Sequence, residues 1–381
     1  MAQQWCGSNA LRGFRGPVGA TGARGATGPT GPTLPQVGTF YSDYLYWNPA
    51  LNAGAGDWAV GATTVHLGSN AGRTSQGSQT VAVGNSAGSF QQAASATAVG
   101  SSAGNFQQGG SAVAVGALAG NTSQGSLTVA VGPNAGQTSQ GSGSVAVGFG
   151  AGAGTQGINS VAIGRFAANF AQGTLSVAVG VFAGSTSQGT LAVAAGPAAG
   201  QTSQGIGSVA VGFAAGGSNQ GGVNGAAVAV GRRAGENNQG SEAVAVGLQA
   251  GRANQGTGAV ALGPSSASNT QGAGAVAIGS GAAGNFQSLN SVCIGSATTL
   301  QGATGAVVVG YATVLSGATG ATAAGGVVLN GTGAAFSAPA GLTYGGFWVT
   351  PVRGVTAAQL GANDKPVYYN TTLREFIYLT T

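Results

Sequence analysis

A glycine that recurs with an unchanging spacing is the strongest constraint on how this chain folds. It stands at Gly68, Gly84 and Gly100 and keeps the same sixteen-position interval as far as Gly212. After three additional residues the series resumes at Gly231 and ends at Gly310, which gives sixteen units. A fixed period is typical of repeat architectures, in which each unit buries its apolar residues against its neighbours. We therefore expect one elongated array from these 381 residues rather than two globular cores.

Each unit predicts a short β-strand. The three residues before the repeated glycine alternate as Val-Ala-Val, with β-branched side chains at the outer positions, as in residues 81–83. A Gln-Gly pair begins eight positions after the glycine, as at Gln76 and Gly77, and its glycine indicates a turn or a close approach of the backbone. The pattern predicts an all-β parallel β-solenoid, with one coil for each unit and coils stacked about 4.8 Å apart.

The predicted strand has two apolar faces. We expect the outer Val and Ile side chains to be buried within the array, although two such side chains contribute too little to order a whole coil. The middle position stays alanine in thirteen units, smaller than a solvent-exposed position requires, so we expect this face to pack against another copy of the chain. The candidate packing residues are Ala82, Ala98, Ala114, Ala130, Ala146, Ala162, Ala178 and Ala210. His66, Cys293 and Val308 replace alanine near the ends, as capping units require.

Residues 13–33 form seven uninterrupted Gly-X-Y triplets. Only glycine fits at the axis where three polyproline-type chains meet, so this pattern predicts a collagen-like triple helix and hence a homotrimer. The glycines at that axis are Gly13, Gly16, Gly19, Gly22, Gly25, Gly28 and Gly31.

The repeat, with its Ala-Gly and Gln-Gly spacers, resembles the head repeats of trimeric autotransporter adhesins, whose heads are trimers of left-handed parallel β-rolls. Residues 44–48 and 58–61 before the array, and 327–330, 347–353 and 365–378 after it, are similar to the ends of fibre proteins of giant DNA viruses and phages. The resemblance implies a homotrimeric left-handed β-roll that projects from a virion surface and mediates attachment. A bacterial surface or spore-coat adhesin or filament protein, located on the outside of the cell or spore, is the alternative.

Together, the triplets, the repeat and the resemblance suggest five segments. They are a docking peptide (1–12), a collagen-like stalk (13–33), an aromatic-rich entry cap (34–64), a β-roll shaft (65–330) and a small β tip (331–381). We expect residues 1–12 to bind a docking protein on the particle or cell surface, and trimers to be able to join end to end. The tip is the expected contact with a glycan or receptor on the host, through Phe347, Trp348, Tyr368 and Tyr369.

The composition leaves few groups for catalysis. Charged residues make up 4% of the chain, with six acidic residues and one histidine. Of the acids, only Glu236 and Glu242 share a unit, beside Arg232 and Arg233, and we interpret them as a surface ion-pair cluster. We expect no enzyme activity, no cofactor and no metal site. The chain shows no basic patch for nucleic acid, no signal peptide and no apolar run of about 18 residues, so we expect no membrane insertion.

One column of the repeat alternates between threonine and phenylalanine. A row of threonine hydroxyls suggests binding of ice or of a glycan, but phenylalanine interrupts that row in several units. We favour packing at turns or between chains for these phenylalanines over a ligand platform. The column contains Thr74, Phe90, Phe106, Thr122, Thr138, Phe170, Thr186 and Thr202.

Overall fold

The computed structural model describes residues 43–49, 51–61, 63–222, 225–301, 304–316, 326–330, 336–337, 347–350, 367–370 and 375–378. The chain forms two compact units, Met1–Val60 and Gly61–Thr381. The first unit contains β1 (Tyr44–Asn48), which pairs with β2 (Asp57–Gly61), and a single 3-10 turn, η1 (Asn52–Gly54), between them. In this two-stranded sheet the rings of Trp47 and Trp58 meet edge to face, with centroids 5.7 Å apart.

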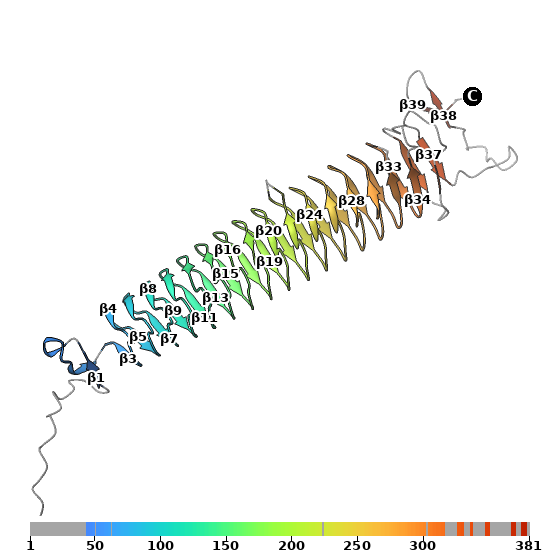
Figure 1. Ribbon diagram of the computed structural model, residues 1–381. Coiled ribbons are helices and arrows are strands. Elements are labelled where there is room, and N and C mark those ends of the chain that lie inside the picture. Colours follow the sequence, from blue (N-terminus) through green and yellow to red (C-terminus); the bar gives the residue numbers. More distant parts are fainter. Residues whose placement is uncertain are drawn as a thin grey trace, which may run out of the picture. The chain divides into compact units, whose positions relative to one another are not determined.

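The second unit is a parallel β-solenoid with two strands in each turn (Figure 1). The strands that carry the Val-Ala-Val motif stack into one parallel sheet, which we call the valine sheet. They are β3 (Val65–Leu67), β5 (Val81–Val83), β7 (Thr97–Val99), β9 (Val113–Val115), β11 (Val129–Val131), β13 (Val145–Val147), β15 (Val161–Ile163), β17 (Val177–Val179), β19 (Val193–Ala195), β21 (Val209–Val211), β23 (Val228–Val230), β25 (Val244–Val246), β27 (Val260–Leu262), β29 (Val276–Ile278), β31 (Val292–Ile294), β33 (Val307–Gly310), β35 (Val327–Asn330) and β37 (Phe347–Thr350).

The strands that carry the repeated glutamine, with those that take their place in the last coils, form a second parallel sheet, the glutamine sheet, which the sequence pattern did not predict. They are β4 (Thr74–Gln76), β6 (Phe90–Gln92), β8 (Phe106–Gln108), β10 (Thr122–Gln124), β12 (Ser139–Gln140), β14 (Thr155–Gln156), β16 (Ala171–Gln172), β18 (Ser187–Gln188), β20 (Thr202–Gln204), β22 (Ser218–Gln220), β24 (Asn237–Gln239), β26 (Ala253–Gln255), β28 (Thr270–Gln271), β30 (Phe286–Gln287), β32 (Thr299–Gln301), β34 (Thr313–Ser316) and β36 (Phe336–Ser337). An antiparallel pair, β38 (Val367–Asn370) and β39 (Glu375–Tyr378), follows in the chain.

Neighbouring coils pair in register. Val129, Ala130 and Val131 lie beside Val145, Ala146 and Val147, the equivalent residues of the next coil. The three-residue insertion after β22 leaves this register intact, because β21 pairs with β23 Val to Val and Ala to Ala. Each column of the repeat therefore becomes a row of like side chains along the solenoid.

The alanine column lies inside the coil, so the expectation that it packs against another chain is wrong. Ala82, Ala98, Ala114, Ala130, Ala146, Ala162, Ala178 and Ala210 are completely buried within the single chain. The flanking Val and Ile side chains point outward instead and remain partly exposed. An alanine with no accessible surface cannot contact a partner chain. The small size of this residue is explained by the narrow space between the two sheets.

Glutamine fills that narrow space. The repeated glutamines are between 0 and 4% exposed from Gln92 to Gln287, and each reaches from the glutamine sheet to the valine sheet. Gln188 is representative: its Nε2 donates to the carbonyl oxygen of Val177 at 2.7 Å and to that of Ala192 at 3.3 Å. Its amide also joins a ladder along the axis, accepting from Gln172 and donating to Gln204. A buried amide is tolerated only when it is hydrogen-bonded, and the ladder satisfies both ends of the Gln188 amide. The ladder is interrupted in other coils, where the Oε1 atom has no hydrogen-bond partner, at Gln92, Gln108, Gln124, Gln156, Gln172 and Gln239.

Two of the three regular glycines of the motif are required for different reasons. The glycine that ends each valine strand has a positive φ, as at Gly180 with +132°, and a Cβ there would lie 2.7 Å from the carbonyl carbon of Gly196 in the next coil. The glycine after glutamine does not need a positive φ, but a Cβ on Gly189 would lie 2.7 Å from the carbonyl carbon of Gly205. The predicted close approach of the backbone at these positions is confirmed.

The interior changes composition toward the carboxyl-terminal coils. Leu300 takes the place of glutamine, and Cys293, Val308 and Val328 take that of alanine, all of them completely buried. At the other end His66 occupies the alanine column in β3. A hydrophobic interior thus replaces the amide ladder as the array ends, in keeping with the atypical end units expected from the sequence.

Candidate functional site

The outer surface of the valine sheet is an extended apolar face. Two rows of Val and Ile side chains run along it, and the turns on both sides add further exposed apolar groups. One or two positions beyond the strand glycine lie Leu118, Phe149, Val181, Phe213 and Leu248, and two or three positions before the strand lie Leu127, Ile158, Leu175, Leu191, Ile206 and Leu289. We call this surface the valine face. Contiguous apolar surface on this scale marks an interaction site.

Aromatic rings reinforce one border of the valine face. Phe166 packs edge to face on Phe149 and stacks on Phe182, with ring centroids 5.1 and 5.4 Å apart. The guanidinium of Arg165 lies over the rings of Phe166 and Phe182 at 5.5 and 5.2 Å. These residues stand in successive coils, so the register of the repeat brings them together.

The outer surface of the glutamine sheet is polar and uncharged along most of its length. A positive φ at the residue before glutamine in many coils, as at Ser123 with +53°, interrupts the strand alternation. The two residues before the glutamine can then both be placed on the outside while the glutamine points inward. Exposed amides form a second ladder here, in which Asn219 donates to Asn238 and Asn238 to Asn254 at 3.1 and 3.0 Å.

One stretch of this polar face is hollowed and aromatic. Phe90 and Phe106 stack in parallel with centroids 4.9 Å apart and an interplanar angle of 1°. They line a shallow groove with Thr74, Gln91 and Thr122. The guanidinium of Arg73 lies 5.7 Å from the Phe90 ring centroid at one end of the stack. Phe170, in the same column, stands apart from this pair and is 63% exposed.

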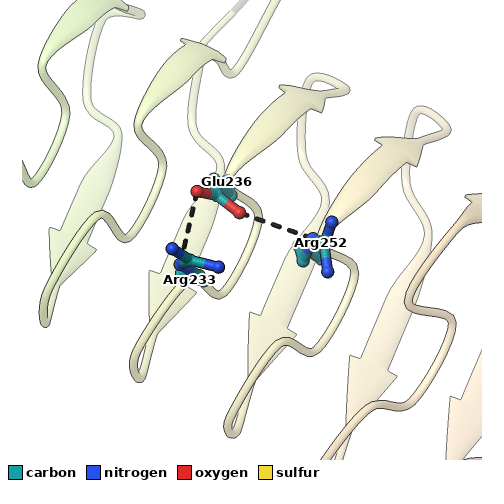
Figure 2. Close-up of polar contacts among 3 residues, drawn as sticks. All are labelled: Arg233, Glu236 and Arg252. Atoms are coloured by element: carbon teal, nitrogen blue, oxygen red, sulfur yellow. Dashed lines mark ion pairs between the residues drawn. The ribbon is translucent and has the colours of Figure 1, made fainter.

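The charged residues around the insertion form an ion-pair cluster, as expected, but its composition differs from the prediction. Glu236 and Arg233 belong to it, whereas Glu242 and Arg232 form no ion pair among the described residues. Glu236 lies between Arg233, whose Nε is 3.6 Å from one carboxylate oxygen, and Arg252, whose Nε is 3.4 Å from the other (Figure 2). Arg252 belongs to the next coil and was not singled out from the sequence. All three side chains are partly exposed, so the pairs stabilise the fold only weakly.

Two ionisable side chains lie inside the solenoid. Burial lowers the pKa of His66, and burial raises the pKa of the Cys293 thiol to about 12, against a smaller opposing effect of a hydrogen bond with Thr298. Both effects hold the side chain in its neutral form at pH 7. Among the described residues no group of three His, Cys, Asp or Glu side chains could hold a metal ion.

The residues predicted as sites near the two ends fall partly outside the described part of the chain. The collagen-like glycines, the docking peptide and most of the tip lie outside the described residues. Phe347 and Trp348 belong to β37, which pairs with β35, whereas Tyr368 and Tyr369 belong to the β38–β39 pair. In the part of the chain that the structure describes, no helix is long and apolar enough to span a membrane.

Comparisons with protein-family models, with curated proteins and with solved structures found no match to this chain.

Proposed function

We propose that this chain is the structural subunit of a homotrimeric fibre on the surface of a virus particle, where it mediates attachment and catalyses no reaction. The valine face carries the proposal. A single solenoid leaves two rows of Val and Ile and two apolar borders in water, and burying them would release about 25 cal/mol for each Å² covered. A second and third copy of the same chain offer surfaces of equal length and pitch.

The two faces of the solenoid suit such an assembly. Three valine faces around a common axis would bury the apolar rows, while the three glutamine sheets, with their hydroxyl and amide side chains, would face solvent. The strict Gly-X-Y triplets of residues 13–33 independently call for three chains. The triplets thus suggest the number of chains, and the apolar surface of the shaft gives a physical reason for the chains to associate.

A long uncharged stretch of the shaft suits a mechanical role. Residues 74–164 contain no Asp, Glu, Lys, Arg or His. With buried backbone ladders and no ionisable groups, the stability of this stretch should not depend on pH or salt. A stacked array of this kind suits a part that bears load, and residues 1–12 and the tip would provide docking and attachment.

Light scattering on the full chain and on residues 34–381 tests the assembly. One chain has a mass of 35.9 kDa, and the full-length trimer should have three times that mass. We expect both preparations to be trimers, which would make the collagen-like segment a spacer. A trimer only in the presence of residues 1–33 would assign assembly to the stalk, and a monomer in both would overturn the proposal.

A further inference from the structure

The stacked phenylalanines lie in a hollow on the polar side of the solenoid. The groove lined by Phe90, Phe106 and Gln91 adjoins a second hollow, formed where β4 and β6 end, and the two share Ser75 and Gln91. Together they cross the first four coils of the glutamine sheet. Phe106 is 43% exposed in this groove, so the ring pair does not merely fill the turn.

The charge of the groove restricts its occupant. Residues 74–164 carry no ionisable side chain, and Arg73, at the end of the ring stack, immediately precedes this stretch. A polyanion such as a nucleic acid is bound through many phosphate contacts with Lys and Arg, which this surface lacks. An acidic or basic peptide would likewise find no row of opposite charges. The surface is complementary to an uncharged polar molecule.

The side chains in the groove suit a sugar. Aromatic rings supply apolar surface against which the C–H face of a pyranose can pack, and the amide of Gln91 has both a donor and an acceptor for hydroxyl groups. This amide makes no hydrogen bond within the described residues, while Gln107 accepts one from Ser123. Successive rings are 4.9 Å apart, close to the length of one hexose unit in an extended chain.

We propose that this groove binds a neutral oligosaccharide that lies along the solenoid, with about one sugar unit for each coil. The site is distinct from the tip and from the valine face, since it lies on the outer side of the other sheet. It therefore goes beyond the proposed trimer, in which it would remain exposed in all three copies. Phenylalanine replaces the usual threonine of this column in two successive coils, as a local binding site requires.

An array of neutral oligosaccharides, with sialylated and sulfated ones for comparison, should be probed with the full-length chain. The neutral glycan that binds best should then be titrated by calorimetry. In the double variant Phe90→Thr and Phe106→Thr, each ring is replaced by the residue found in neighbouring coils, so the fold should be preserved. We expect its affinity to fall at least about tenfold, equivalent to ~1.4 kcal/mol.

Phe170→Thr is the matched control, because it removes an exposed phenylalanine from the same column outside the groove. It should bind like the unaltered chain, and Gln91→Ala should weaken binding without changing the rings. The proposal is overturned if no neutral glycan binds, if only acidic glycans bind, or if the double variant binds as well as the control. Light scattering on the same samples separates the two proposals, since a monomer that binds the glycan would refute the trimer alone.

Discussion

Replacing one interior glutamine should destabilise the solenoid far more than replacing its exposed neighbour. Gln108 is 1% exposed, and its Nε2 donates to the carbonyl oxygens of Thr97 at 2.8 Å and Ala112 at 3.3 Å. In Gln108→Ala these carbonyls lose a donor, at about 1–3 kcal/mol for a buried group, and a cavity remains, at about 2–5 kcal/mol for large-to-small changes. The Oε1 of Gln108 accepts no hydrogen bond in the described structure, so its removal offsets part of this cost. We expect a net loss of about 3–5 kcal/mol.

Gln107→Ala is the control, because Gln107 is exposed and in the same coil. It should change stability by no more than about 0.5 kcal/mol. Because repeat arrays need not unfold in one step, denaturation followed by circular dichroism should be combined with native-state hydrogen exchange of residues 97–124. Equal effects of the two substitutions, or a loss below about 1 kcal/mol for Gln108→Ala, would refute the role assigned to the amide ladder.

Three further predictions follow from the close packing and burial inside the solenoid. Gly180→Ala should destabilise strongly, because its Cβ would meet the backbone of the next coil at φ +132°, whereas Gly258→Ala, with φ +64° and open space around it, should cost only about 1 kcal/mol in thermal denaturation. The thiol of Cys293, with its pKa raised to about 12, should react with Ellman's reagent only after denaturation, and rapid reaction in buffer would contradict its burial. Because the pKa of His66 is lowered in the folded state, the imidazole is protonated in the unfolded state at a higher pH than in the folded state. The first coil should therefore lose stability as pH falls below about 6.5, and His66→Ala should abolish that dependence in hydrogen exchange at pH 7.5 and 5.5.

The period of the sequence predicted the solenoid, but not which strand face is inside. Alternation with period two separates Val from Ala without stating which of them meets solvent. The larger apolar residues are expected in the core, which is the usual rule in globular domains. Here the glutamine determines which face is inside. Its long side chain occupies the space between the sheets, so only Ala fits opposite it. The regularity of the glutamine column was visible, but was interpreted as a turn signal.

The contacts between side chains of neighbouring coils could have been predicted from the period of the sequence. Equivalent residues of successive units lie side by side, so Glu236 faces Arg252 and Phe90 stacks on Phe106. The groove beside Phe90 could not be predicted from the register alone. Gln91 lines it with a positive φ, and none of the residue types found in the Gln91 column indicates such a backbone conformation. The predicted stalk and tip stay predictions.

In the proposed fibre, copies of the chain meet through the valine face, and paired charge substitutions test this contact most directly. One variant replaces Val131, Val147 and Ile163 by Asp in the valine sheet, and the control replaces Ser123, Ser139 and Thr155 by Asp in the glutamine sheet. Both place three like charges in successive coils, so repulsion within the chain is matched. The native mass should fall from that of three chains toward the 35.9 kDa of a single chain in the first variant and remain trimeric in the control. Trimers in both, or dissociation of the control alone, would contradict the account.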